Sequence, residues 1–207
     1  MPLALLAVLS EHGDLVTLSE FHDWYDNEHI PLRLDLSTFL TGARFSAIDA
    51  KSPSWLALTT RSEREAGLVE RLEVLDRRIC EVVWDSGESS KTTSFRVENP
   101  TTFIVTHSLG QPALENAVMW AEEAVQKLRG KEEWVRTRAF NCVEAFKTGV
   151  GISSGTEAHK AFPFFVLHEF LAQAPTLKWS EIGTDESLPE LRKWELYRAY
   201  RSLSQKA

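Results

Sequence analysis

Short apolar runs alternate with polar, turn-forming segments along the first half of the chain. Four runs of strand length predict four strands, at residues 3–9, 41–48, 55–60 and 79–84. Two segments between them have helical spacing. Residues 20–30 follow Ser19, a residue type that caps helices, and Pro31 is expected to disturb the helix beyond them. Residues 62–78 have the leucine spacing of an amphipathic helix.

The same order of elements recurs in the second half. Its strands are predicted at residues 103–107, 134–146, 162–170 and 194–200. Helices are predicted over residues 113–128, where Gly130 ends the pattern, and over residues 188–193. Residues 147–160 have no counterpart in the first half. This loop, rich in glycine and serine, either covers an entrance or is a disordered connection.

Three pairs of segments show that the repeat extends to residue types. The pairs are residues 39–45 with 134–140, residues 55–59 with 164–168, and residues 77–81 with 192–196. The first pair has aromatic residues at both ends, the second is largely apolar, and the third begins with two basic residues. Because the three pairs occur in the same order, we infer two copies of one βαββαβ unit, at residues 1–98 and 99–207.

Composition and charge narrow the classes of function. The formal net charge is −7, and no run of lysine or arginine provides the basic stripe of a nucleic-acid-binding protein. The apolar run near the start is too short to span a bilayer and lacks the features of a signal peptide. We therefore expect a soluble, cytoplasmic protein without nucleic-acid or membrane partners. Cys80 and Cys142 are isolated in the sequence and are expected to be two core or half-buried thiols.

The first predicted helix carries two neighbouring stripes. At about 100° per residue, a polar stripe contains His22, Asp26, His29 and Arg33. An apolar stripe beside it contains Phe21, Trp24, Tyr25 and Leu32. Glu28 lies within the apolar stripe, and a carboxylate on a buried face is costly unless it is paired. Glu28 is therefore expected to mark a site, or else to bond a backbone amide or Arg44.

His29 is the expected acid or base of this helix. An imidazole has an unperturbed pKa near 6.5, so a small shift lets it exchange protons at neutral pH. Asp26, one turn earlier, can hold the ring in one tautomer. The alternative is that Asp26 and His29 form a helix-surface pair without a catalytic role.

Three further residues are weaker candidates. Arg44, on a predicted strand, either holds a substrate carboxylate or phenolate or pairs with Glu28. His168 and His107 each share a strand face with apolar residues, so each is either a second acid or base or a hydrogen-bonded core histidine. We expect no metal site, because the helical histidines lack a ligand from another element.

The segment containing Trp24, Tyr25, Glu28, His29 and Pro31 resembles the first helix of the EthD-like branch of the dimeric α+β-barrel superfamily. The resemblance extends to Phe39, Arg44 and Phe45, and to the strand at residues 55–58. It implies ferredoxin-like units whose sheets pair into a barrel, with ligands bound between sheet and helices and without a cofactor. The family includes decarboxylases, cyclases, isomerases and cofactor-independent oxygenases that act on polyketides or aromatic compounds, together with proteins of no known activity. The tandem form resembles proteins of fungal secondary metabolism.

The second half departs from this motif. Trp120 aligns with Trp24, but residues 121–125 contain nothing that matches Glu28 and His29. His168 and Glu169 keep a polar strand end that the first half lacks. We therefore expect one working site, in the first half.

The resulting hypothesis is an α+β chain that forms an intramolecular dimeric α+β barrel from two ferredoxin-like repeats. It would be a monomer with an internal pseudo-dimer, and a weaker homodimer is left open. The expected pocket wall consists of Trp24, Tyr25, Glu28, Phe39 and Phe45. His29, oriented by Asp26, would move a proton beside a carbonyl of an aromatic or polyketide-like substrate, and Arg44 or His168 would stabilise the enolate. The alternatives are a cofactor-independent monooxygenase and a non-catalytic binding or stress-response protein.

Overall fold

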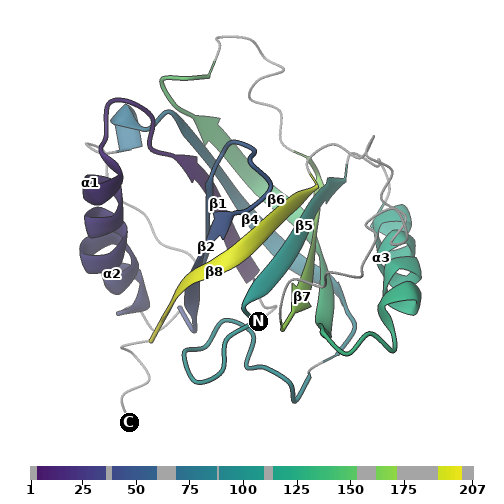
Figure 1. Ribbon diagram of the computed structural model, residues 1–207. Helices are drawn as coiled ribbons and strands as arrows, with labels where there is room; N and C mark the ends of the chain where they lie inside the picture. Colours follow the sequence, from purple (N-terminus) through teal and green to yellow (C-terminus); the bar gives the residue numbers. More distant parts are fainter. Residues whose placement is uncertain are drawn as a thin grey trace.

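Each strand of the described chain pairs with two others, so the sheet closes into an eight-stranded antiparallel barrel (Figure 1). The computed structural model describes residues 4–35, 39–59, 69–87, 89–109, 114–152, 162–171 and 191–201. The strands are β1 (Ala4–Glu11), β2 (Gly42–Ala47), β3 (Trp55–Thr59), β4 (Val74–Asp85), β5 (Phe103–Leu109), β6 (Trp134–Thr148), β7 (Phe164–Phe170) and β8 (Arg192–Tyr200). The helices are α1 (Leu18–Asp23), the π-helix η1 (Trp24–His29), α2 (Ile30–Leu34), the short 3₁₀ helix η2 (Val69–Arg71) and α3 (Leu114–Leu128).

Both halves of the chain use one strand order. In the first half β1 lies between β3 and β4, and β2 pairs with β3 on the far side. In the second half β5 lies between β7 and β8, and β6 pairs with β7. The halves join at two equivalent seams, β2 with β8 and β4 with β6. One chain therefore supplies the whole barrel, and closure leaves no unpaired edge strand.

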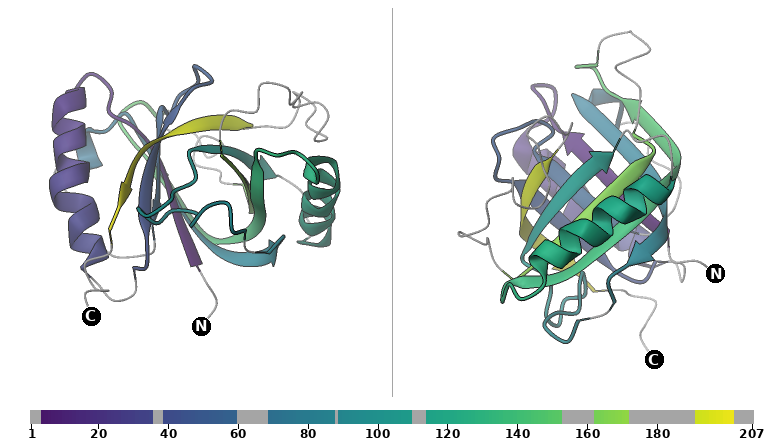
Figure 2. Two further views of the ribbon diagram at one scale, coloured as in Figure 1. Left: turned by 60° about the horizontal axis from the view of Figure 1, so that its bottom comes forward. Right: turned by 90° about the vertical axis from the view of Figure 1, so that its right-hand side faces the viewer.

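The helices lie outside the barrel on opposite flanks (Figure 1 and Figure 2). The α1–η1–α2 helix covers one flank, and α3 covers the other. Within the described residues, no helix has both the length and the apolar character needed to cross a bilayer. Each flank therefore has its own layer of side chains between helix and sheet, separate from the barrel interior.

Alternate side chains of all eight strands fill the barrel interior. The interior cluster contains Leu5, Ala7, Leu9, Ala43, Phe45, Leu56, Leu58, Cys80, Ile104, Phe140, Phe165, Leu167 and Trp194. Phe95, from the loop between β4 and β5, joins this cluster from one end of the barrel. The interior is therefore a packed apolar core, as is usual for small barrels.

The predicted strands are confirmed, but two predicted helices are wrong where they can be compared. β4 begins at Val74, so the last residues of the helix predicted over 62–78 belong to a strand. β8 likewise begins at Arg192, inside the helix predicted over 188–193. β4 has buried side chains on both faces, which removes the alternation that identifies a half-buried strand. Residues 60–68 and 172–190 lie outside the described part of the chain.

The third repeat pair needs a shift of one residue. Aligning residues 77–81 with 192–196 places Ile79 opposite Trp194, but Ile79 packs towards the first helix. Cys80 and Trp194 are the two residues that face the barrel interior. β4 and β8 therefore occupy equivalent places in the two halves, but their interior-facing residues align only after this shift of one residue.

The first helix begins earlier and ends later than predicted. The side chain of Thr17, rather than Ser19, caps it by accepting a hydrogen bond from the Glu20 N–H at 3.2 Å. Its middle is a π-helix, in which the Ile30 N–H bonds to the Tyr25 carbonyl five residues back. This wider turn precedes Pro31, which has no N–H to donate, and the helix continues to Leu34.

We expect Phe45→Ala to lower the free energy of unfolding by roughly 3–5 kcal/mol, because it leaves a cavity in the barrel core. The Phe45 side chain is fully buried and lies 5.9 Å from the Phe95 ring, centroid to centroid. Phe146→Ala is the matched control, since Phe146 is 54% exposed, and it should change stability by about 0.5 kcal/mol or less. Urea unfolding measures both, and equal losses would contradict a core position for Phe45.

Candidate functional site

A group of polar and aromatic side chains joins the first helix to the barrel wall. We call it the helix–sheet group; its members are His22, Asp26, Arg44, Tyr197 and Tyr200. Arg44, on the outer face of β2, donates to Asp26 Oδ1 at 2.6 Å and to His22 Nδ1 at 3.0 Å. The predicted Arg44–Glu28 pair is therefore wrong, and Asp26 is the partner of Arg44.

Asp26 is held by four donors. Besides Arg44, it accepts hydrogen bonds from Arg198 at 3.0 Å, from the Tyr197 hydroxyl at 3.3 Å and from the Tyr200 hydroxyl. Burial acts to raise the pKa of Asp26, but the hydrogen bonds from Tyr200 and Arg44 and the charge of Arg44 outweigh it and lower the pKa. Burial and the bond to Asp26 raise the pKa of Tyr200. Asp26 is therefore an anion with its acceptor sites occupied.

Aromatic rings surround the buried Arg44 guanidinium. Its centre lies 4.4 Å from the Tyr25 ring, 4.9 Å from the Tyr197 ring and 5.3 Å from the Trp55 ring. His22 stacks on Tyr197 with ring centroids 4.7 Å apart. Burial and the positive charge of Arg44 lower the pKa of His22. Because a guanidinium only donates, His22 Nδ1 accepts here, and its proton lies on Nε2.

The π-helix changes which side chains share a face. A π-turn rotates less per residue than an α-turn, so the stripes drawn at α-helical spacing do not hold over Trp24–His29. His29 is buried among aromatic rings, 4.3 Å from Trp24 and 5.2 Å from Tyr25 between centroids. The Asp26 carboxylate instead points to Arg44. Glu28 is exposed, so the predicted buried carboxylate is wrong.

The predicted substrate wall is divided by the sheet. Trp24, Tyr25 and Phe39 belong to the buried cluster between the first helix and the sheet. Phe45 faces the barrel interior with Phe95. Because successive strand residues point to opposite faces, Phe45 cannot line the same pocket as the other three aromatic residues.

His168 lies on the opposite flank from Arg44, beneath α3. Its Nδ1 is 2.8 Å from the Thr137 hydroxyl, and its ring is edge-on to His107 with centroids 5.2 Å apart. Burial lowers the pKa of His168 to about 3 and that of His107 well below its ordinary value. Both rings are therefore neutral, and Arg44 and His168 cannot act on the same small molecule because the barrel lies between them (Figure 1).

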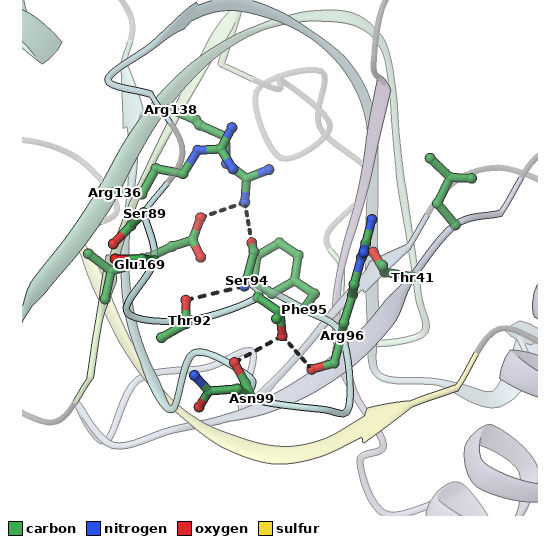
Figure 3. A pocket seen from close by; sticks show the side chains of 14 residues that line it. Thr41, Ser89, Thr92, Ser94, Phe95, Arg96, Asn99, Arg136, Arg138 and Glu169 are labelled. Carbon is green, nitrogen blue, oxygen red and sulfur yellow. Dashed lines mark hydrogen bonds and ion pairs between the residues drawn. The ribbon is translucent and has the colours of Figure 1, made fainter.

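A pocket of about 540 Å³ opens at one end of the barrel, beside the loop that joins β4 to β5. We call it the end pocket. It is lined by Leu40, Thr41, Ser89, Ser90, Thr92, Thr93, Ser94, Phe95, Arg96, Asn99, Val135, Arg136, Arg138 and Glu169 (Figure 3). This size is within the range of small-molecule sites, and the lining is rich in hydroxyl and guanidinium groups.

Hydrogen bonds within the loop hold the wall of the end pocket. The Thr93 N–H bonds to the Asn99 carbonyl at 2.8 Å, and the Thr101 N–H bonds to the Ser94 carbonyl at 2.7 Å. Ser94 has a φ of 60°, so the chain turns sharply just before Phe95 enters the barrel core. The loop between β4 and β5 is thus held by these backbone hydrogen bonds and by the Phe95 side chain in the barrel core.

In this wall the half-buried Arg138 forms an ion pair with the buried Glu169. Arg138 Nη2 donates to Glu169 Oε1 at 2.6 Å and to the Ser94 hydroxyl at 3.0 Å (Figure 3). The Thr101 hydroxyl donates to Glu169 Oε2 at 2.8 Å, and the Thr92 and Thr101 hydroxyl oxygens lie 3.0 Å apart. Arg138 Nε is buried without an acceptor, so this guanidinium has unused donor capacity.

Two more arginines line the end pocket. Arg136 pairs with Asp85, with Nε donating to Oδ1 at 2.9 Å, and Arg96 is exposed. With Arg138 included, the lining holds three cations and one carboxylate, which favours ligands that carry or develop negative charge. Among all the described residues, no group of three or more His, Cys, Asp or Glu side chains is placed to hold a metal ion.

The candidate residues of the end pocket did not stand out in the sequence. Arg136 and Arg138 alternate along a strand, and such a pattern indicates an exposed face as readily as a pocket. Glu169 offered one signal, since it follows His168 at a polar strand end that the first half lacks. Their convergence depends on β6 pairing with β7, where Arg136 lies opposite Glu169 and Arg138 opposite Leu167.

Comparisons with known proteins bear on the fold alone. No protein-family model and no curated protein matches the chain. Among solved structures, the chain is similar to a crystal structure of an anthrone oxidase-like protein, with a TM-score of 0.56 and 11% sequence identity. The match covers 96% of this chain and 92% of that one. The chain therefore shares the α+β-barrel fold over nearly its whole length.

We expect Asp26→Asn to lower the free energy of unfolding by roughly 3 kcal/mol at pH 7, because it leaves the buried Arg44 without its anion. Asp23→Asn, on the exposed face of the same helix, is the matched control and should cost about 0.5 kcal/mol or less. The folded pKa of Asp26 lies below the ordinary 3.8, so its contribution is complete above that value and is lost as the pH falls through the folded pKa. The difference in free energy of unfolding between wild type and Asp26→Asn should therefore become smaller below pH 4. A difference that does not change with pH would contradict the ion pair.

We expect His168 to lower the free energy of unfolding as the pH is decreased from its ordinary pKa of 6.5 to its folded pKa of about 3. In this range the unfolded chain binds a proton that the folded chain does not, which costs roughly 1.4 kcal/mol per pH unit. His168→Gln should remove the contribution of His168 to that slope in urea unfolding measured from pH 6 to pH 4, whereas the buried His107 keeps its own contribution. Thr137→Val is the control, since it removes the hydrogen bond and keeps the titrating ring. An unchanged slope in His168→Gln would refute the buried neutral histidine.

Proposed function

We propose that this chain is a cofactor-free small-molecule enzyme that uses acid–base chemistry in the end pocket. Its substrate would be a carbonyl-bearing aromatic or polyketide-like compound. The observation that carries this proposal is the Arg138–Glu169 pair, with a buried carboxylate and a half-buried guanidinium, in the wall of a 540 Å³ pocket. A carboxylate can act as a base beside a carbonyl, and a neighbouring guanidinium can stabilise the negative charge that develops on the oxygen.

We also propose that the chain has the architecture predicted from the sequence, a tandem of two ferredoxin-like repeats, residues 1–98 and 99–207, that form an internal pseudo-dimer. The shared strand order and the two equivalent seams support it. Kinship with the EthD-like branch stays a prediction that rests on the first-helix residues, among them Trp24, Tyr25 and His29.

Binding would rely on polar contacts more than on apolar enclosure. Arg96, Arg136 and Arg138 would attract an oxyanion, and the Ser and Thr hydroxyls would bond ring substituents. Phe95 provides an aromatic surface at the base of the loop, with Arg138 5.2 Å from its ring centroid. A flat, oxygenated ring system suits this combination better than a purely apolar ligand does.

The chemical step would be proton abstraction from a carbon beside the substrate carbonyl. A substrate oxygen that bonds to Arg138 would compete with Glu169 for the guanidinium and leave the carboxylate as the base. The proton would move to Glu169, and the negative charge that develops on the substrate oxygen would be stabilised by Arg138. Decarboxylation, cyclisation and isomerisation all pass through such an enolate.

A cofactor-independent oxygenase is the second candidate function. The structural neighbour is described as anthrone oxidase-like, and anthrone is an aromatic ketone with an acidic methylene group. Deprotonation of that methylene gives an enolate that can react with dioxygen. Both candidate functions begin with the same deprotonation. Consumption of dioxygen by the protein in the presence of anthrone would distinguish the oxygenase from the acid–base enzyme.

The helix–sheet group is a second location for the same chemistry. His22 and the Tyr197 hydroxyl are partly exposed beside the buried Arg44 and Asp26, and His29 lies in the same helix. In this alternative His29 keeps the acid–base role predicted from the sequence, Arg44 is the anion-binding residue, and Asp26 holds Arg44 rather than His29. Substitutions in the end pocket and in the helix–sheet group distinguish which of the two holds the active site.

We expect Glu169→Gln to slow exchange of the anthrone methylene protons for deuterium by about 100-fold or more, because it removes the base and keeps the shape. Anthrone is the probe, and proton NMR in deuterated water measures the exchange. Arg138→Met should weaken binding of anthrone by roughly tenfold. Glu98→Gln, an exposed change in the same loop, is the matched control and should leave exchange unchanged.

Two results would count against the end pocket. If Glu169→Gln exchanges protons as fast as wild type while His29→Gln or Asp26→Asn does not, the chemistry belongs to the helix–sheet group. If wild type binds the probe but accelerates no exchange, the chain is a binding protein rather than an enzyme.

A further inference from the structure

The two cysteines of the chain meet across a seam of the barrel. Cys80 lies in β4 and Cys142 in β6, and their Sγ atoms are 2.8 Å apart. Both are free thiols in this structure. The prediction of two core or half-buried thiols is confirmed, but it did not include their contact, which arises because residues 62 positions apart become neighbours when β4 pairs with β6.

A β-bulge places the thiols opposite each other. Ile79 pairs with Glu144, whereas the next residue of β4, Cys80, pairs with Cys142. Val143 is the extra residue of the bulge, and without it the partner of Cys80 would be a different residue of β6. Directly opposed residues of an antiparallel pair have the side-chain separation that a disulfide bridge needs.

The two thiols have different surroundings. Cys80 is fully buried in the barrel core, whereas Cys142 is partly exposed. The hydrogen bond from Cys80 lowers the pKa of Cys142 and raises that of Cys80, and the positive charge of Arg78 favours the thiolate of Cys142. Cys142 is therefore the thiol that can meet an oxidant, and Cys80 is the thiol that water and reagents do not reach.

We propose that Cys80 and Cys142 are a peroxide-sensitive thiol pair that closes a reversible disulfide across the β4–β6 seam. The Cys142 thiolate attacks one oxygen of hydrogen peroxide, the O–O bond breaks, and the products are Cys142 sulfenic acid and, after protonation, one water. The Cys80 sulfur then attacks the Cys142 sulfur and displaces the hydroxyl, which leaves as a second water with the Cys80 proton. Two thiols are oxidised and one peroxide is reduced. A dithiol reverses the step by thiol–disulfide exchange.

The bridge would link the two halves of the chain at one of their two seams. β4 belongs to the first half and β6 to the second, so the disulfide closes a loop that contains β5 and α3 (Figure 1). Restricting such a long loop in the unfolded chain stabilises the folded state. The pair is made of residues outside the end pocket lining, so the proposal stands or falls independently of the proposed enzyme function.

The test is the mass and the melting temperature of the wild-type chain after treatment with hydrogen peroxide. We expect a loss of two hydrogens without addition of oxygen, no free thiol on alkylation in denaturant, and a rise in Tm of roughly 5–10 °C that dithiothreitol reverses. Accumulation of oxygen adducts on wild type, disulfide-linked dimers, or persistence of both free thiols would overturn the proposal.

Two matched variants assign the order of the step. Cys80→Ser should stop at the sulfenic acid, which dimedone captures on Cys142, whereas Cys142→Ser should leave Cys80 unmodified because that thiol is buried. Capture of dimedone on Cys80 in Cys142→Ser would overturn the assignment of Cys142 as the first thiol oxidised. The wild-type measurement needs neither variant, so a variant that fails to fold does not remove the test.

Discussion

Closure of the sheet is the constraint on which the other features depend. Each half contributes four strands, whose outer members would expose unpaired backbone groups if the half stood alone. Pairing of β2 with β8 and of β4 with β6 satisfies those groups and encloses a core that draws side chains from every strand. Apolar side chains fill most of the interior, and the polar groups lie on the two flanks beneath the helices, at the ends of the barrel, at the seams and in one buried cluster around Arg78.

Buried arginine–carboxylate pairs occupy these places, and they differ in what remains available for a ligand. Asp26 accepts from four donors, of which Arg44 is one, so this pair connects the first helix to the sheet. Arg78 is tied to Asp76 and to Ser108 within the barrel. Arg138 also has partners, but its Nε lacks an acceptor and its side chain lines a pocket. The same residue types therefore hold the fold together in one place and can bind a ligand in another.

The two flanks of the barrel carry different side-chain chemistry. The first flank holds charged groups, with Arg44, Asp26 and Arg198 beneath the helix that includes the π-turn. The second flank holds the neutral rings of His107 and His168, which contact Trp120 of α3, a regular α-helix. A shared strand order is thus compatible with different chemistry, because backbone pairing fixes the barrel while side chains between helix and sheet only have to pack. The end pocket draws on both halves: nine of its lining residues belong to residues 1–98, and five, including Arg138 and Glu169, belong to residues 99–207.

The sequence alone determined the elements whose cause is local. Apolar runs located the eight strands, and the period of residues 113–128 located α3, because burial of one segment leaves its mark on that segment. Tertiary structure decided what depends on register. The π-turn rotated His29 and Glu28 to positions that an α-helical wheel does not give, and double-sided burial made the start of β4 resemble a helix. The meetings of Arg138 with Glu169 and of Cys80 with Cys142 depend on which strand residues face each other, and a shift of one position would undo them. Pairing between distant strands leaves no periodic signal in either strand, so only the closed barrel reveals these contacts.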